Sequence, residues 1–193
     1  MRDEWFIRGK VPMTKSEVRA VSISKLELEP DSVLWDVGAG TGSVSVEASF
    51  FCPHGHVYAF EKNPEAIRLM EENRKKAGQG NITIIEGTAP ESFSCLENPA
   101  LSGAKKVTHA FLGGTNGWLD EILDALFACN PDVRVVMNVI ALESLSSILT
   151  SLEHRGIEPE IISLSVARGE KAGNYHLMKG QNPVYIISFG GLS

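Results

Sequence analysis

Three glycines at every second position, Gly38, Gly40 and Gly42, directly follow an apolar run that carries one acid, Asp36. Glycines in this arrangement let the backbone approach a ligand closely and adopt conformations that other residues resist. The spacing differs from the G-x-G-x-x-G fingerprint of dinucleotide sites, because Ser43 follows Gly42. The pattern therefore predicts a nucleotide-binding loop and weakens the interpretation as an NAD site.

Two acids are placed to contact a ligand at this loop. Asp36 lies two residues before Gly38, where its short carboxylate could hold an ammonium group directly or through water. Glu61 ends the next apolar run, about 20 residues after the loop, and is placed to accept hydrogen bonds from both hydroxyls of a ribose. A ligand with a ribose, an ammonium group and a carboxylate is S-adenosylmethionine, which is the predicted cofactor.

The surrounding chain alternates short apolar runs with helical patterns, which predicts an α/β fold with a mostly parallel sheet and helices on both faces. In such sheets ligands collect beyond the carboxyl ends of the strands. Strands are expected over residues 33–37, 56–60, 82–85, 107–112 and 133–138. Helices are expected over residues 14–28, 43–51, 64–76, 118–129 and 142–154, with a short one near 90–96 inside a loop over 86–106.

Three local features refine these bounds. Thr14 followed by Glu17 matches the capping-box pattern, which places the start of the first helix at Thr14. Asn63 before Pro64 predicts a capped start for the third helix. The β-rich runs 161–167 and 183–189 are expected to close the sheet as an antiparallel pair, joined by a polar loop over 168–182.

Composition limits the class of protein. A chain of 193 residues that is 43% hydrophobic fits one domain, with an N-terminal arm and helix over 1–30, a cofactor-binding core over 31–156 and a C-terminal β pair with a substrate loop over 157–193. The net charge of −6 argues against a nucleic-acid partner. Three scattered cysteines and the lack of a signal peptide or an apolar membrane span favour a cytoplasmic protein with no membrane partner, and no metal site is predicted.

Several segments together resemble the decarboxylating precorrin C15-methyltransferases of cobalamin biosynthesis, which are class I S-adenosylmethionine-dependent enzymes. The most particular is the arm Arg8-Gly9-Lys10-Val11-Pro12-Met13-Thr14-Lys15. The others are the run 35–47 around the glycine loop, Glu61-Lys62-Asn63-Pro64, Phe111-Leu112-Gly113-Gly114, and Tyr175-His176 before Asn182-Pro183-Val184-Tyr185. The match covers nearly the whole chain. It implies the Rossmann-like fold of that class, with a seven-stranded sheet that ends in an antiparallel strand pair.

The resemblance also implies the reaction, which is methyl transfer from S-adenosylmethionine to C15 of a precorrin or cobalt-precorrin with loss of CO2 from the ring C acetate. The residues expected to bind the cofactor are Pro12, Met13, Thr14, Asp36, Gly38, Ala39, Gly40, Thr41, Gly42, Glu61, Lys62, Thr88 and Ala89. Such enzymes often have Glu-Gly-Asp-Ala-Pro after the third strand, whereas this chain has Thr88 at the position of the acid. Adenine recognition is therefore expected from the Thr88 hydroxyl and the Ala89 backbone N–H.

A substrate with many carboxylates would be held by basic side chains. One basic cluster lies in the arm and first helix (Arg8, Lys10, Lys15 and Arg19), and another in the late polar loop (Arg168, Lys171 and Lys179). Both are expected to lie over the crevice at the glycine loop. The further residues expected at the substrate are Gly113 and Gly114, which would clear space for the flat ring, and Asn138 and Glu143. His176, beside Tyr175, is the candidate for proton transfer or carboxylate binding.

The resemblance further implies a homo-oligomer, expected to be a tetramer, and raises the prospect of a C5-methylating partner. Two alternatives stay open from the sequence. One is a class I methyltransferase for another small molecule or for a protein, which would keep the glycine loop and Glu61 but has no need of the basic clusters. The other is a non-catalytic module that binds a nucleotide. Substitution of Arg8 and Lys10 tests the first alternative, because unchanged turnover of a precorrin would count against the assigned substrate. Calorimetry with S-adenosylmethionine tests binding of the cofactor, and its absence would remove every interpretation as a methyltransferase.

Overall fold

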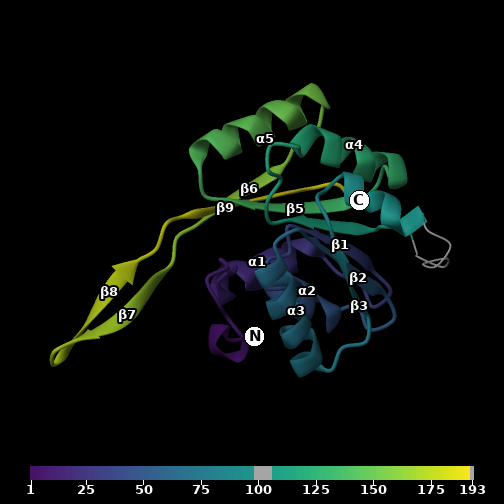
Figure 1. Cartoon of the computed structure of the whole chain (residues 1–193). Coiled ribbons are helices and arrows are strands. Elements are labelled where there is room, and N and C mark those ends of the chain that lie inside the picture. Colours follow the sequence, from purple (N-terminus) through teal and green to yellow (C-terminus); the bar gives the residue numbers. More distant parts are fainter. Residues whose placement is uncertain (98–105, 192–193) are drawn as a thin grey trace.

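The computed structural model describes residues 1–97 and 106–191, and its centre is a seven-stranded sheet in the order β3-β2-β1-β4-β5-β9-β6 (Figure 1). The first five strands pair in parallel, and β9 lies antiparallel between β5 and β6. This confirms the predicted sheet and its antiparallel end. The strands are β1 (Val33–Val37), β2 (His56–Glu61), β3 (Ile82–Glu86), β4 (His109–Leu112), β5 (Arg134–Val139), β6 (Glu160–Leu164) and β9 (Val184–Phe189).

Helices cover both faces of the sheet, as predicted (Figure 1). One face carries α1 (Ser16–Leu26), α2 (Ser43–Ser49) and α3 (Pro64–Ala77), and the other carries α4 (Leu119–Cys129) and α5 (Leu142–His154). The described helices also include two 3₁₀ helices, η1 (Asp3–Trp5) and η2 (Glu91–Glu97). Within the described ranges, none of the helices has the length and hydrophobicity needed to cross a bilayer.

The strand β1 shows how the sequence places the site. All five of its residues are buried, and their side chains alternate between the two faces. Val33, Trp35 and Val37 join the core under α4 and α5, whereas Leu34 packs on the α1 and α2 side. Asp36 therefore also points toward α2, which begins directly after the glycine loop. The alternation thus brings a buried acid to the carboxyl end of the central strand.

The start of α3 agrees with the sequence, and the start of α1 does not. The Asn63 side chain accepts hydrogen bonds from the backbone N–H groups of Glu65 and Ala66, which confirms the predicted cap. The predicted cap at Thr14 is wrong, because α1 begins at Ser16 with Lys15 at the cap position and without a side-chain cap. The Thr14 carbonyl accepts a hydrogen bond from Arg19 Nη1 at 2.6 Å and lies outside the helix.

The predicted loop over 86–106 is described only in part. The short helix expected near 90–96 is the 3₁₀ helix η2, which packs Phe93 against Trp35 and Phe60. The rest of the predicted loop, residues 98–105, lies outside the described residues.

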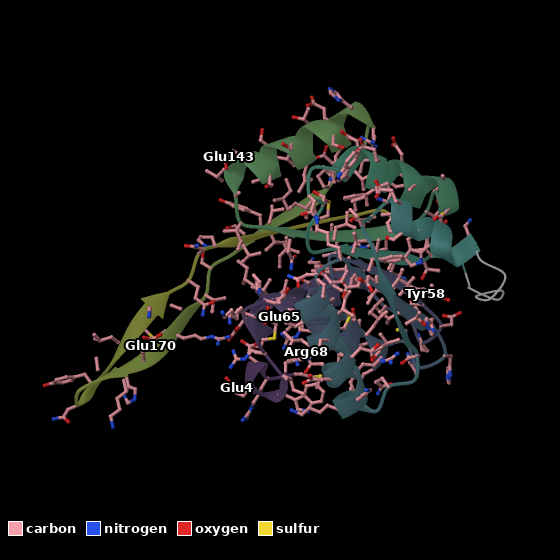
Figure 2. All side chains as sticks on the ribbon, in the orientation of Figure 1. Glu4, Tyr58, Glu65, Arg68, Glu143 and Glu170 are labelled. Carbon is pink, nitrogen blue, oxygen red and sulfur yellow. The ribbon has the colours of Figure 1, made fainter. Side chains whose placement is uncertain are left out.

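The predicted polar loop over 168–182 is wrong, because most of it forms a second sheet. Strands β7 (Ala167–Ala172) and β8 (Tyr175–Gly180) pair in antiparallel fashion around a two-residue turn at Gly173 and Asn174. Gly173 has a φ of 63°, the left-handed conformation that glycine adopts without strain. This hairpin extends away from the body of the protein (Figure 1), and Figure 2 shows Glu170 on it, far from the main sheet.

Candidate active site

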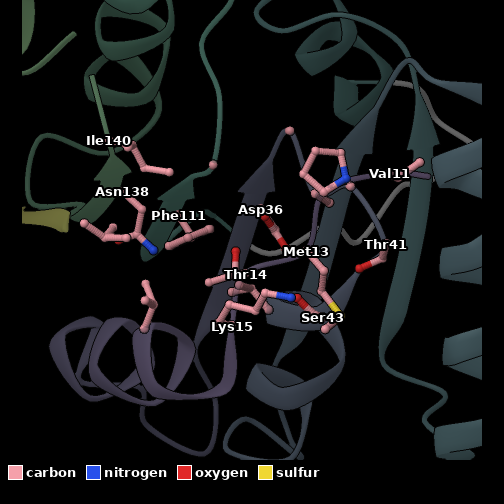
Figure 3. A pocket seen from close by; sticks show the side chains of 18 of the residues that line it. Val11, Met13, Thr14, Lys15, Asp36, Thr41, Ser43, Phe111, Asn138 and Ile140 are labelled. Carbon is pink, nitrogen blue, oxygen red and sulfur yellow. The ribbon is translucent and has the colours of Figure 1, made fainter. Parts of the chain in front are cut away.

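A cavity of about 510 Å³ lies where the carboxyl ends of β1, β4 and β5 meet the N-terminal arm (Figure 3). Arm residues 11–15 and the glycine loop form one side. Phe111, Asn138 and Ile140 form the opposite side (Figure 3). The root of the β7–β8 hairpin completes the wall with Leu164, Val166, Gln181, Asn182 and Val184.

The glycine loop needs its glycines because of close neighbours and backbone shape. Gly38, Gly40 and Gly42 all have φ between 57° and 74°, which strains any other residue. A side-chain carbon on Gly42 would lie 2.4 Å from Met70 Cγ on α3, and one on Gly38 would lie 3.1 Å from the backbone of Gly114. The loop is therefore packed tightly between α3 and the segment that follows β4.

Glu61 fixes the shape of the loop from the end of β2. Its Oε2 accepts a hydrogen bond from the Gly40 N–H at 2.8 Å. Its Oε1 accepts hydrogen bonds from the N–H groups of Lys62 and Asn63 at 2.8 and 2.9 Å. A carboxylate oxygen has two lone-pair sites, so Oε2, which accepts one hydrogen bond, can accept a further one. Glu61 thus holds the loop and retains acceptor capacity toward the cavity, whose wall it forms.

Asp36 is a fully buried carboxyl on the cavity wall. The Ser45 hydroxyl on α2 donates a hydrogen bond to its Oδ2. Its Oδ1 has no hydrogen-bond partner among the described residues. Burial raises the pKa of Asp36 to about 7, the hydrogen bonds from Ser45 oppose this shift, and the nearby charge of Glu61 adds to it. An unpaired buried acceptor is costly, so this oxygen is suited to a cationic donor in the cavity.

A second unpaired polar atom lies on the same wall. Thr41 is buried, and its hydroxyl has no partner among the described residues. Its carbonyl accepts a hydrogen bond at 3.0 Å from the amide of Asn73, a buried residue of α3. The same amide binds the carbonyl and the N–H of Ile7 in the arm. Asn73 therefore ties the arm to the glycine loop, so the cavity is held from both sides.

A second, narrow cavity of about 20 Å³ lies on the other side of the glycine loop. It shares Gly38 and Glu61 with the first cavity, and Gly114, which packs against Gly38, lines the narrow cavity alone. The remaining walls come from the end of β2, the segment after β3 and the segment after β4, with Val37, Phe60, Lys62, Gly87, Thr88, Ala89, Thr115, Asn116 and Ile122. The two cavities thus meet at Gly38 and Glu61.

Many of the predicted site residues line these cavities. Those at the larger cavity are Pro12, Met13, Thr14, Lys15, Asp36, Gly38, Ala39, Gly40, Thr41, Glu61, Gly113 and Asn138. Those at the narrow cavity are Gly38, Glu61, Lys62, Thr88, Ala89 and Gly114. Gly42 lines neither, and instead begins α2 in the left-handed conformation.

Other predicted site residues lie elsewhere. Arg8 and Lys10 are exposed on the arm, and Figure 2 shows Glu143 at the start of α5 on the outer surface. Lys171, Tyr175 and His176 are exposed on the β7–β8 hairpin, outside both cavities. The expectation that the whole late segment lies over the crevice is therefore wrong for this chain. Only the root of the hairpin reaches the cavity, because the segment pairs with itself.

Two of the predicted substrate cations are engaged in ion pairs within the chain. Arg19 is completely buried, with Nε 2.6 Å from Glu47 Oε2 and Nη1 3.4 Å from Asp3 Oδ1. It also donates to the carbonyls of Met1 and Thr14 and is not accessible to a substrate. Arg168, at the hairpin root, pairs with Glu17 and with Asp3, and its hydrogen bond lowers the pKa of Glu17. These contacts fasten the N-terminus and the hairpin root to α1.

Sequence reasoning missed several residues at the site. Ser45 and Asn73 hold Asp36 and the arm, and each is a polar residue at a buried helix position. That pattern is a usable signal, because buried polar groups need partners. The aliphatic wall of Ile140, Leu164 and Val166 carried no such signal, since apolar residues at strand ends are ordinary core positions.

Comparison with known proteins places these features in a family. A family model described as a precorrin methyltransferase domain matches residues 4–189. A cobalt-precorrin-6B C(15)-methyltransferase (decarboxylating) from Salmonella typhimurium is 42% identical over 191 residues, which cover 97% of this chain and 94% of that protein. A crystal structure of precorrin-6y C5,15-methyltransferase from Geobacter metallireducens matches with a TM-score of 0.86 and 36% identity, covering 98% of this chain and 97% of that one.

A second crystal structure, of precorrin 8w decarboxylase from Methanobacterium thermoautotrophicum, matches with a TM-score of 0.85 and 34% identity. It covers 98% of this chain and 99% of that one. These likenesses extend over the arm, the glycine loop and the hairpin alike, since they span nearly the whole chain. Together with the sheet order, they confirm the predicted class I methyltransferase fold.

Proposed function

Because this chain belongs to the precorrin methyltransferase family, we propose that it transfers a methyl group from S-adenosylmethionine to C15 of a cobalt-precorrin or precorrin, with loss of CO2 from the ring C acetate. The observation that carries the proposal is the pair of cavities that meet at Gly38 and Glu61. An adenosyl compound has its ribose between an adenine and an amino-acid end, and the acid at the junction suits the two ribose hydroxyls.

The residues of the larger cavity fit the amino-acid end of such a cofactor. The unpaired Oδ1 of Asp36 and the unpaired hydroxyl of Thr41 are buried polar atoms on its wall. An ammonium group and a carboxylate supply the partners that these atoms lack. The narrow cavity would take the adenine, between Thr88 and Ala89 on one side and Asn116 on the other. A purine is larger than this slot, so the walls of the slot must move apart on binding.

Methyl transfer from a sulfonium is an in-line displacement, and the bound cofactor supplies the electrophilic methyl group. The protein's part is mainly to align the reactants, because an electron-rich tetrapyrrole carbon needs no strong base. The arm residues Met13 and Thr14 and the strand residue Phe111 define the space where the two meet (Figure 3). When the acetate C–C bond breaks, the electron pair enters the conjugated macrocycle, so the protein need not provide an electron sink.

Substitution of Glu61 by glutamine is expected to weaken binding of S-adenosylhomocysteine by about 10-fold to 100-fold, because hydrogen bonds to a charged acceptor are lost. The measurement is isothermal titration calorimetry. The matched control is Glu86→Gln, since Glu86 lies opposite Glu61 in the register of β2 and β3 but lines neither cavity. Equal affinities for the Glu61→Gln variant and the wild type would count against the proposed ribose contact.

Lys15 is the one basic residue among those that line the larger cavity in the described part of the chain. We therefore expect it to hold a carboxylate of the tetrapyrrole. Lys15→Met is predicted to raise the KM for the precorrin by about tenfold and to leave the affinity for S-adenosylhomocysteine unchanged. Steady-state kinetics checks this, with Lys75→Met on the exposed side of α3 as the control. An unchanged KM for the Lys15 variant would rule out this contact.

The β7–β8 hairpin supports a homo-oligomer, for which we keep the expectation of a tetramer. Tyr175, Leu177 and Met178 are 61–75% exposed on β8, an unusual amount of apolar surface for a projecting two-stranded sheet. We propose that a second copy of the chain covers it. Such an arrangement would also bring Tyr175 and His176 near another subunit, which is the setting in which their predicted catalytic role could apply.

The oligomer is expected to dissociate when Leu177 and Met178 are both changed to serine. Size-exclusion chromatography with light scattering measures this, and Glu170→Ser on the same hairpin is the control. A wild type that is monomeric at micromolar concentration would contradict the proposal. The C5-methylating partner and a cytoplasmic location stay predictions, and the name of the Geobacter structure, which joins C5 and C15 methylation, supports the former.

A further inference from the structure

The narrow cavity offers a contact that the sequence did not indicate. We propose that Asn116, in the segment between β4 and α4, recognises the 6-amino edge of the adenine of the cofactor. The proposal rests on the proposed use of S-adenosylmethionine and adds a specificity-determining residue to it. It starts from the finding that Asn116 lines the same cavity as Thr88 and Ala89, although it lies 28 and 27 residues after them in the chain.

The other polar side chains of this cavity are poorly suited to the task. Glu61 already accepts three backbone hydrogen bonds and lies at the junction with the larger cavity. The Lys62 ammonium has donors only, and an adenine amino group needs an acceptor. Thr88 and Thr115 each provide a single hydroxyl. Among the described residues that line this cavity, Asn116 alone carries an acceptor and a donor side by side.

The chemistry of the carboxamide matches that of adenine. The exocyclic amine of adenine donates, and the ring nitrogens beside it accept, so an asparagine can bind with two parallel hydrogen bonds. Apolar side chains, among them Phe60, Ala89 and Ile122, also line this cavity, and a flat purine can pack against them once the slot has widened. A purine without the exocyclic amine keeps the packing and loses one of the two hydrogen bonds. Asn116 would therefore discriminate between these two bases.

The position of Asn116 allows a side-chain test that spares the backbone. Asn116 has a φ of 50° and is followed by Gly117 with a φ of 87°. Asparagine and glycine are the residues that tolerate this left-handed conformation best. Asn116→Gly therefore removes the carboxamide and still allows the left-handed backbone conformation at this position. The matched control is Thr115→Val, which removes the neighbouring hydroxyl from the same segment and the same cavity.

The experiment measures, by calorimetry, the affinities of S-adenosylhomocysteine and of its analogue with an unsubstituted purine. The wild type is expected to prefer the adenine compound by about tenfold, Thr115→Val to keep that preference, and Asn116→Gly to bind the two compounds almost equally. A preference for the adenine compound that persists in Asn116→Gly overturns the proposal. This holds also if the variant binds both compounds more weakly by the same factor, because an equal loss of affinity reports a structural role of Asn116. A wild type that binds neither compound instead contradicts the proposed function.

Discussion

Replacing Asp36 with asparagine is expected to weaken binding of S-adenosylmethionine by about 10-fold to 100-fold, because a charged acceptor for the ammonium group is lost. Asp36 lines the larger cavity, and its buried Oδ1 has no partner among the described residues. Since the pKa of Asp36 is raised to about 7 by burial, the carboxyl is largely neutral in mildly acidic buffer. Affinity for the cofactor in the wild type should therefore rise between pH about 6 and about 8, and Asp36→Asn should lack this rise.

The same substitution is expected to stabilise the free protein at alkaline pH. The folded chain keeps a proton on Asp36 up to about pH 7, whereas an unfolded aspartate, with its ordinary pKa of 3.8, releases it near that pH. The contribution of Asp36 to stability is thus fully present below pH 3.8 and is lost as the pH rises toward 7. A shift of this size corresponds to a cost on the order of 4 kcal/mol above pH 7, which Asp36→Asn avoids.

Chemical denaturation at pH about 5 and about 8 measures this effect, with binding of S-adenosylhomocysteine as the second readout. Asp36→Asn should gain stability over the wild type at the higher pH and lose affinity there. Ser45→Ala is the matched control, because it keeps the carboxyl and removes the hydroxyl that binds its Oδ2. A variant at Asp36 that is less stable at both pH values and binds as the wild type does would refute the assignment.

The second large effect is expected at Arg19. Changing it to methionine should cost about 3–5 kcal/mol of stability, because the carboxylates of Asp3 and Glu47 lose their buried partner. The arm should loosen as well, since Arg19 also holds the carbonyls of Met1 and Thr14. For a chain of this size, the melting temperature should fall by roughly 6–20 °C.

Thermal unfolding and limited proteolysis of the arm measure this prediction. The control is Arg68→Met, because the pair of Arg68 with Glu72 lies exposed on α3 and should contribute less than about 0.5 kcal/mol. Equal melting temperatures for Arg19→Met and Arg68→Met would show that the buried ion pairs do not fasten the arm.

Residues with strong local signals made much of this structure predictable. The alternation around Val33–Val37 and the glycines that follow it predicted the central strand and its loop, because both depend on neighbours in the sequence. Asn63 and Pro64 predicted the start of α3 for the same reason. Glu61 could be placed at the site because parallel strands end at one edge of the sheet.

The parts that were not predictable depend on distant contacts or on weak signals. Arg19 looked like a surface cation because its partners, Asp3 and Glu47, come from separate elements that only the fold brings together. The role of Asn73 depends in the same way on Ile7 and Thr41. The hairpin was missed although Gly173 and Asn174 form a typical two-residue turn, since its strands are polar and exposed and show no core-facing alternation.

The most direct test of the proposed function is mass spectrometry of the product formed from a cobalt-precorrin substrate, with S-adenosylmethionine that carries a deuterated methyl group. The proposed reaction predicts one product that has gained the labelled methyl group and lost CO2. Asp36→Asn should lower the rate of methyl gain and the rate of CO2 loss by the same factor. Substrate recovered without the label, or labelled without loss of CO2 after complete turnover, would contradict the proposal that this site performs decarboxylating methyl transfer.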